Sequence, residues 1–163
     1  MLTPNGPKVI EYNCRFGDPE TQVVLPRLKS DLLEIMMAVR NECLADVDIK
    51  WSDEAAACVV MASGGYPEKY DKGIEMTGLN ENGQIEGATV YHAGTKKENG
   101  KFYTNGGRVL GITATDTTLE GALKKAYDAV SKFILKVHYR TDIGNKKDRS
   151  CLLLLGGILS FYP

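Results

Sequence analysis

Residues 50 to 140 carry a succession of short strand patterns, interrupted by glycine turns and closed by one amphipathic helix. The segment AAACVVMAS, at 55–63, is apolar throughout and predicts a buried strand. Asn82-Gly83 and Asn99-Gly100 are dipeptides that strongly favour tight hairpins. Further strand candidates lie around these turns: IEMTG, GATVYHAG, KFYTN and RVLGITATD. The pattern predicts a compact antiparallel sheet.

The closing helix is expected over residues 117–137. Thr117 and Glu120 have the spacing of a capping box, so Thr117 is the predicted N-cap. Apolar residues recur at helical spacing along one face: Leu119, Ala122, Leu123, Ala126, Val130, Phe133 and Ile134. A helix with such a face needs a surface to cover, and the neighbouring sheet provides one. The expected fold class is therefore α+β.

The N-terminal residues have a different pattern. Residues 8–16 alternate, which predicts a strand with Ile10, Tyr12, Cys14 and Phe16 on one face. Asp18 is then placed to cap a helix whose first residue is Pro19.

A second helix is expected after Pro26, beginning at Ser30 or Asp31. Its apolar stripe, together with Met37, is predicted to be core: Leu32, Leu33, Ile35, Met36 and Val39. Residues 1–45 are too few to bury these surfaces by themselves.

The composition narrows the class of partner. An apolar fraction of 43% is enough for a core, and 20 basic against 21 acidic residues give a net charge of −1. With so small a net charge, the overall electrostatic field does not favour binding to nucleic acid or to an anionic membrane.

The longest apolar run, CLLLLGGILSF, is shorter than the roughly 20 residues of a membrane helix. With no signal-peptide pattern and no metal-site spacing, four cysteines indicate reduced thiols in a cytoplasmic protein: Cys14, Cys43, Cys58 and Cys151.

Glu11, Asn13 and Arg15 share the polar face of the first predicted strand. A carboxylate and an amide oxygen two residues apart can converge on one ion, and both are ligands that Mg²⁺ or Mn²⁺ accepts. Arg15 would suit the phosphates that such an ion accompanies. The alternative is a solvated face of an edge strand, followed by a simple helix cap.

A family resemblance favours the first interpretation. RFGDPETQ, at 15–22, resembles the signature of glycinamide ribonucleotide synthetase (phosphoribosylamine–glycine ligase), an ATP-grasp enzyme of purine synthesis. Further segments match that family in order, from residue 7 to about 146: VVMASGGYPEKYDKG, VYHAGT, NGGRVLGITA and YRTDIG. The resemblance implies the end of an ATP-grasp domain followed by a small sandwich-like domain with a covering helix.

The resemblance also assigns roles to particular residues. It implies that Glu11 and Asn13 hold the catalytic divalent metal, with ATP as co-substrate, and that Arg15 stabilises phosphate charge. It places Asp18 and Glu20 in a substrate-side loop, although Asp18 has the alternative role of a helix cap.

Two later motifs are less specific. By analogy with related enzymes, Arg108 in NGGRV is a candidate contact for the ribose phosphate, the alternative being a glycine hairpin with an exposed arginine. His92 is expected to be a hydrogen-bonded structural residue. The glycine-rich segment at 64–73 lacks the arrangement of a P-loop, and it is expected to be a family loop that closes near the substrate rather than a nucleotide cradle.

The resemblance divides the chain into three parts. Residues 1–48 would end an ATP-grasp domain, residues 49–146 would be the synthetase C-terminal domain, and residues 147–163 would be a divergent apolar tail. The missing domains of the enzyme, and in some members a second purine enzyme fused downstream, are then the expected partners. The chain alone is not expected to turn over glycine, phosphoribosylamine and ATP. Two alternatives stay open: another purine-pathway ATP-grasp ligase or carboxylase, and a non-catalytic module that binds a partner domain.

Overall fold

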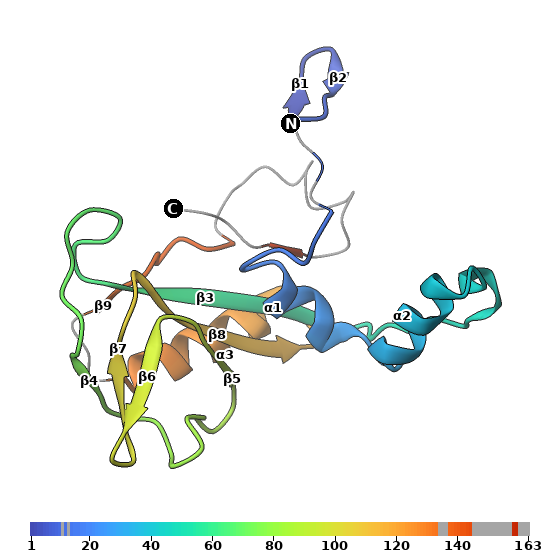
Figure 1. Ribbon diagram of the computed structural model, residues 1–163. Helices are drawn as coiled ribbons and strands as arrows, with labels where there is room; N and C mark the ends of the chain where they lie inside the picture. The colour runs from blue at the N-terminus through green and yellow to red at the C-terminus, as the bar shows by residue number, and fades with distance from the viewer. Residues whose placement is uncertain (11, 13, 134–136, 145–157, 160–163) are drawn as a thin grey trace.

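The computed structural model describes residues 1–10, 12, 14–133, 137–144 and 158–159 (Figure 1). Two long antiparallel strands, β3 (Ala55–Ser63) and β8 (Arg108–Asp116), form the centre of its main sheet. Shorter strands extend this sheet: β5 (Thr89–His92) beside β8, and β9 (Val137–His138) and β10 (Ile158–Leu159) beside β3. All these pairings are antiparallel except that of β10 with β3.

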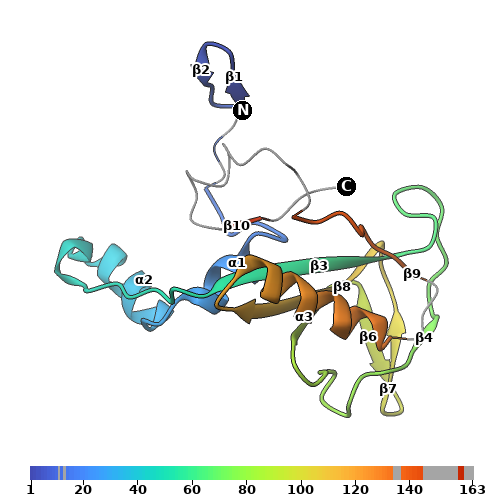
Figure 2. The ribbon, with the colours of Figure 1, turned by 180° about the vertical axis from the view of Figure 1, so that it is seen from behind.

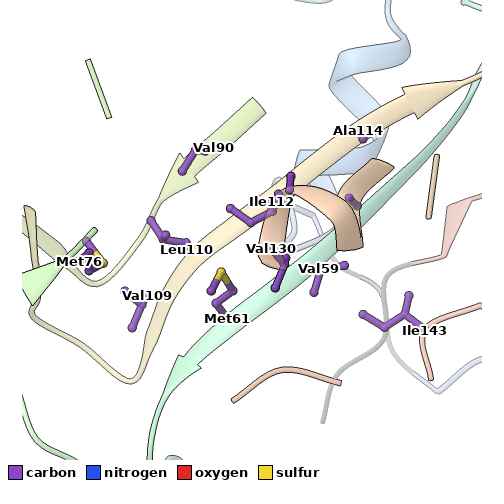
Figure 3. Close-up of a cluster of buried hydrophobic side chains, with 12 residues drawn as sticks. Val59, Met61, Met76, Val90, Val109, Leu110, Ile112, Ala114, Val130 and Ile143 are labelled. Atoms are coloured by element: carbon purple, nitrogen blue, oxygen red, sulfur yellow. The ribbon is translucent and has the colours of Figure 1, made fainter. Parts of the chain in front are cut away.

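The helix α3 (Leu119–Ser131) covers one face of the main sheet, which confirms the expected α+β architecture (Figure 2). Because strand side chains alternate, β3 and β8 each present every second residue to α3. Figure 3 shows the resulting core, in which the following side chains are buried: Val59, Met61, Leu110, Ile112 and, from α3, Val130. The buried alanines of α3 allow close approach to the sheet: Ala122, Ala126 and Ala129.

The N-cap of α3 is Thr118 rather than Thr117. Thr118 Oγ1 accepts a hydrogen bond from the Gly121 amide at 3.0 Å. Thr117 Oγ1 instead donates to Asp116 Oδ1 at 3.1 Å, so its hydroxyl is directed toward the end of β8. The N-cap predicted from the capping box is therefore wrong by one residue, because the Thr117 hydroxyl bonds to Asp116 instead of capping the helix.

A second sheet of three short strands has the order β4 (Glu75–Met76), β7 (Lys101–Thr104), β6 (Thr95–Glu98). Asn99-Gly100 joins β6 to β7, with φ of 49° at Asn99 and 80° at Gly100. Positive φ at both central residues is the geometry of the type I′ hairpin turn, so this predicted hairpin is confirmed.

Asn82-Gly83 does not join two paired strands. The strands on either side of it, β4 and β5, belong to different sheets. Asn80 Oδ1 accepts from the amides of Asn82 and Gln84, and His92 Nε2 lies 2.8 Å from the Gly83 carbonyl oxygen. Two backbone hydrogen bonds of 2.9 Å, from the Asn80 amide to the Gln84 carbonyl oxygen and from the Gly83 amide to the Asn80 carbonyl oxygen, close this turn together with these side chains.

Among the described residues of 8–16 there is no strand. The described strands that lie nearest in sequence are the two-residue pair β1 (Leu2–Thr3) and β2 (Gly6–Pro7). Ile10 and Tyr12 have exposed fractions of 72% and 83%. An extended segment becomes a strand only when its backbone groups find a partner. Lys8 exchanges backbone hydrogen bonds of 2.9 and 2.8 Å with Met1, but this pairing does not continue through the described residues that follow Lys8.

The first helical segment begins later than expected. The helix α1 (Thr21–Val24) is followed by a 3₁₀ turn, η1 (Leu25–Arg27). Glu20, not Asp18, holds the N-cap position, and its side chain accepts no capping hydrogen bond. The Asp18 carboxylate accepts instead from Gln22 Nε2 at 2.7 Å. The expectation that Pro19 opens the helix is therefore wrong.

The helix α2 (Leu32–Arg40) begins as predicted, because Asp31 caps it by accepting from the amides of Leu33 and Glu34. Its apolar stripe, however, is not core. Leu33 is 66% exposed and Val39 is 56% exposed, and only Ala38 is buried. Figures 1 and 2 show α2 and the short turn η2 (Leu44–Asp46) at one end of the molecule, away from α3. Periodicity identified the helix but could not tell whether this chain covers its apolar face.

The substitution Met36→Lys is expected to change the free energy of unfolding of this chain by less than about 0.5 kcal/mol, because the Met36 side chain is already in contact with water. Ile112→Ala, at a fully buried position, should cost about 3 kcal/mol. Urea denaturation followed by circular dichroism measures both. A comparable loss for the two variants would mean that the α2 stripe is core after all.

Within the described residues, no helix is both long and apolar enough to cross a membrane.

Candidate functional site

A pocket lies where the N-terminal segment, the main sheet and the C-terminal segment meet. Its cavity volume is about 70 Å³, and it opens into a wider hollow of about 570 Å³ that includes open solvent. Eleven residues line it: Pro19 from the RFGDPE segment, Cys58, Val60 and Ala62 from β3, Tyr66 and Pro67 from the following loop, Arg108 from β8, and His138, Tyr139, Arg140 and Ile143 near the C-terminus. The walls are mostly apolar, with two arginines and a histidine among them.

Arg108 connects the RFGDPE segment to the sheet. Its Nη2 lies 3.1 Å from Asp18 Oδ2, and its Nη1 donates to the Asp18 carbonyl oxygen at 3.3 Å. The Arg108 side chain is 30% exposed and the Asp18 side chain 53% exposed. A pair this exposed contributes only about 0.2–1 kcal/mol to stability. Its main consequence is positional, because it fixes one cation at the edge of the pocket.

The glycines before Arg108 allow close backbone packing. The Gly94 amide donates to the Arg108 carbonyl oxygen at 2.9 Å, and a Cβ added to Gly94 would lie 2.5 Å from Gly106 Cα. Ser63 holds the Gly106-Gly107 turn in place through two hydrogen bonds of 2.8 Å. The Ser63 amide donates to the Gly107 carbonyl oxygen, and the Ser63 hydroxyl donates to the Gly106 carbonyl oxygen. Arg108 therefore extends from a tightly fixed backbone.

Tyr66 lies directly against Gly107. Any Cβ at Gly107 would collide with the Tyr66 ring, so the absence of a side chain there makes room for the aromatic wall of the pocket. Tyr66 was not singled out from sequence. The available signal is the GGYP segment, which belongs to a family loop expected to close near the substrate.

Arg140 is held from two sides. Its carbonyl oxygen accepts a 2.7 Å hydrogen bond from the Tyr127 hydroxyl of α3, and the same hydroxyl accepts from the Ile143 amide at 3.2 Å. Its guanidinium donates to both oxygens of Asp142, at 2.9 and 2.7 Å. Sequence reasoning did not select Arg140 either, although it lies in the YRTDIG motif.

Cys58 contributes a neutral thiol to the pocket floor. It is 3% exposed, and burial raises the pKa of its thiol to about 11, with a smaller raising contribution from the charge of Asp18. Thr113, which lies opposite Cys58 on β8, has the opposite effect and lowers this pKa, although its Oγ1 forms no hydrogen bond of ordinary geometry among the described residues. The floor therefore carries no charge at physiological pH.

The raised pKa predicts slow alkylation of Cys58. Because the thiolate is the nucleophile, Cys58 should stay unlabelled by iodoacetamide at pH 8, while exposed Cys14 is labelled within minutes. Labelling of Cys58 should rise only as the pH approaches 11, or when urea unfolds the chain. Peptide mapping by mass spectrometry measures each position, and equal rates for the two cysteines at pH 8 would contradict the prediction.

Arg15 and Glu20, the other candidate residues that the structure describes, do not line this pocket. Glu11 and Asn13 lie outside the described residues. Arg15 is exposed, and its Nη1 donates to the Phe16 carbonyl oxygen at 3.4 Å. Glu20 is half-buried, and its Oε2 lies against Gly17 without a hydrogen-bond partner among the described residues. Asp18 and Arg108 are the two candidates that the structure brings together.

His92 has the environment of a structural residue, as expected. Its Nδ1 lies 3.0 Å from Thr95 Oγ1, and its ring packs against Phe102 with 5.1 Å between ring centroids.

Comparison with known families identifies the chain. The family model described as the phosphoribosylglycinamide synthetase C domain matches residues 56–146, more than half of the 163 residues. The chain belongs to the phosphoribosylglycinamide synthetase family. The model of that family's ATP-grasp (A) domain matches residues 1–21. The Asp18–Arg108 ion pair therefore joins residues that match two different domains of the family.

Individual relatives agree with the family. The chain is 53% identical over 146 residues to the trifunctional purine biosynthetic protein adenosine-3 of Gallus gallus, covering 88% of this chain and 14% of that protein. It is 48% identical over 144 residues to the phosphoribosylamine–glycine ligase of Caldanaerobacter subterraneus, covering 88% of this chain and 34% of the relative. A crystal structure of phosphoribosylamine–glycine ligase from Thermotoga maritima matches with a TM-score of 0.66 and 33% identity, over 87% of this chain and 34% of that one.

The chain thus spans about a seventh to a third of the length of these relatives. In the bacterial relatives the matching segment belongs to a protein named for the ligase alone. In Gallus gallus and in Pichia angusta it belongs to trifunctional and bifunctional purine biosynthetic proteins. Residues 22–55 lie between the two family-model matches, so a domain boundary at residue 48 stays a prediction.

Proposed function

We propose that this chain is the C-terminal portion of a cytoplasmic phosphoribosylamine–glycine ligase. The reaction joins glycine to 5-phosphoribosylamine, with ATP consumed to ADP and phosphate through a glycyl phosphate. The observation that carries the proposal is the match of residues 56–146 to the synthetase C domain, supported by 48% identity to a named ligase. The chain alone is expected to be inactive, because it spans only 34% of that relative.

Glu11 and Asn13 would hold the divalent metal. Their carboxylate and amide oxygens are hard donors that suit Mg²⁺ or Mn²⁺, which is the fit required of such a site. When bound, the ion supplies positive charge beside the phosphates of ATP. Arg15 is proposed to stabilise the charge of the phosphoryl group that is transferred to glycine.

Arg108 and Asp18 would form the side of the site that receives phosphoribosylamine. The guanidinium offers paired donors to the sugar's phosphate group, and the carboxylate can accept from its hydroxyl or amine groups. Glu20 belongs to the same proposed substrate loop, although it does not line the pocket described above. The amine of phosphoribosylamine attacks the carbonyl carbon of glycyl phosphate, the C–O bond to phosphate breaks, and the amide forms.

A chimera tests the proposal. Residues 1–146 of this chain would replace the corresponding part of the Caldanaerobacter ligase, and glycinamide ribonucleotide formation would be measured with glycine, phosphoribosylamine and ATP. The chimera is expected to be active, whereas this chain alone and the truncated ligase alone are not. A folded chimera that binds ATP but forms no amide would overturn the proposal, as would turnover by the chain alone.

A further inference from the structure

The pocket combines aromatic walls, a neutral floor and two cations. Tyr66 and Tyr139 supply aromatic surface, and the Cys58 thiol leaves the floor uncharged. Arg108 and Arg140 reach the same space from different segments, one from β8 and one from the C-terminal segment. Such a lining suits a ligand with a ring-shaped body and one strongly anionic group, because each part of the ligand finds its own kind of surface.

Both arginines extend from fixed backbone. Arg108 follows the glycine turn that Ser63 and Gly94 secure. The Arg140 backbone is tied to α3 through the Tyr127 hydroxyl. Because α3 packs on β3 and β8, the two guanidinium groups are positioned by one common core. A pair of cations held in this way is pre-organised, so little ordering is required when a ligand binds.

Each arginine already has a carboxylate partner. Arg108 pairs with Asp18 and Arg140 with Asp142, and all four side chains are at least 30% exposed. Exposed ion pairs contribute little, whereas a phosphate dianion between two guanidinium groups accepts charge-assisted hydrogen bonds from both. The existing pairs hold the donors in place without making them unavailable to a phosphate.

We propose that Arg140 is a second phosphate-binding residue, and that the ligand of the pocket is a phosphorylated sugar whose phosphate lies between Arg108 and Arg140. The sugar ring would lie against the aromatic walls, where Tyr66 is seated on Gly107. This inference rests on the proposed function and extends it, because it assigns a role to a residue outside the RFGDPE and NGGRV motifs. It also predicts that a sugar phosphate binds more tightly than either ribose or inorganic phosphate, because both parts of the ligand contact the pocket.

Titration of the ¹⁵N-labelled chain with ribose 5-phosphate tests the proposal by two-dimensional NMR. Ribose 5-phosphate should shift the amide resonances of the Gly106–Arg108 turn and of Arg140, and ribose without phosphate should not. Arg140→Gln should raise the dissociation constant about tenfold. Arg140→Lys, which keeps the charge but loses the fork of donors, should raise it less. Arg40→Gln, a matched change on the distant helix α2, should have no effect.

The outcomes separate this inference from the proposed function. If Arg140→Gln binds ribose 5-phosphate as well as the unchanged chain does, while Arg108→Gln binds it weakly, Arg140 has no role in binding. If inorganic phosphate binds as tightly as ribose 5-phosphate, or if the unchanged chain does not respond to the sugar phosphate, the assignment of a sugar phosphate is overturned. In all these cases the activity of the chimera still decides the proposed function. Circular dichroism of each variant checks that it is folded.

Discussion

Gly94→Ala is expected to lower the free energy of unfolding by about 3 kcal/mol, because the added methyl group would meet backbone atoms that have no room to move. The new Cβ would lie 2.5 Å from Gly106 Cα and 2.6 Å from the Arg108 carbonyl oxygen. The Arg108 oxygen also accepts a hydrogen bond from the Gly94 amide, so relief of the clash would break that bond. Urea denaturation gives the free-energy change directly.

Gly100→Ala is the matched control. Gly100 has a φ of 80° and no other atom within 4 Å of an added Cβ, so this substitution adds only the strain of the left-handed conformation. That strain costs about 1 kcal/mol. Equal losses for the two variants would show that the Gly94–Gly106 contact is not tight. A larger loss for Gly94→Ala supports a rigid base for Arg108.

The central part of the fold could be predicted because its signals are local. The two long strands β3 and β8 match the expected segments at 55–63 and 108–116. The apolar runs and the flanking glycines determine both their type and their ends. Asn99-Gly100 likewise determines a turn by its own conformational preference. For these elements, the residues that determine the structure lie within the element or directly beside it in the sequence.

Apart from the one-residue error at Thr117, the main failures concern residues whose state depends on contacts with distant parts of the chain. Residues 8–16 have a strand pattern, yet a strand needs a second strand to bond to. Asp18 is a residue type that often caps helices, but here its carboxylate forms an ion pair with Arg108, which is 90 residues away, and accepts a hydrogen bond from Gln22. The α2 stripe has helical periodicity, but periodicity does not say which surface covers it. No window of local sequence contains this information.

The same limit applies to the pocket. Sequence reasoning selected Arg108 through its glycine turn and Asp18 through the RFGDPE motif. Arg140 and Tyr66 are neighbours of Arg108 only after β3, β8 and α3 have packed together. Their chemistry depends on tertiary contacts, namely the Tyr127 hydroxyl for Arg140 and the bare Gly107 for Tyr66. A motif can mark such residues as family features without indicating what they contact.

Arg108→Gln should reduce kcat/KM for phosphoribosylamine about 100-fold in the chimeric ligase, mainly through a higher KM. Charge-assisted hydrogen bonds to a phosphate contribute about 1.5–3 kcal/mol, and glutamine supplies neither the charge nor the paired donors. The chain should nevertheless stay folded, because the Asp18–Arg108 pair is exposed and contributes less than about 1 kcal/mol. Steady-state kinetics, with thermal melting of the same samples, separates the two effects.

Two further variants show whether the loss comes from phosphate binding. Asp18→Asn removes the carboxylate that pairs with Arg108 but leaves the guanidinium, and its amide oxygen can still accept from the substrate's hydroxyl groups, so KM should change much less than in Arg108→Gln. Arg40→Gln removes one positive charge from α2 and should leave both kinetic constants unchanged, which excludes an effect of net charge. If Arg108→Gln lowers kcat while KM stays constant, Arg108 acts on the chemical step rather than on substrate binding. If its activity falls only in parallel with its melting temperature, the side chain supports the fold, and the pocket must hold its ligand through other residues.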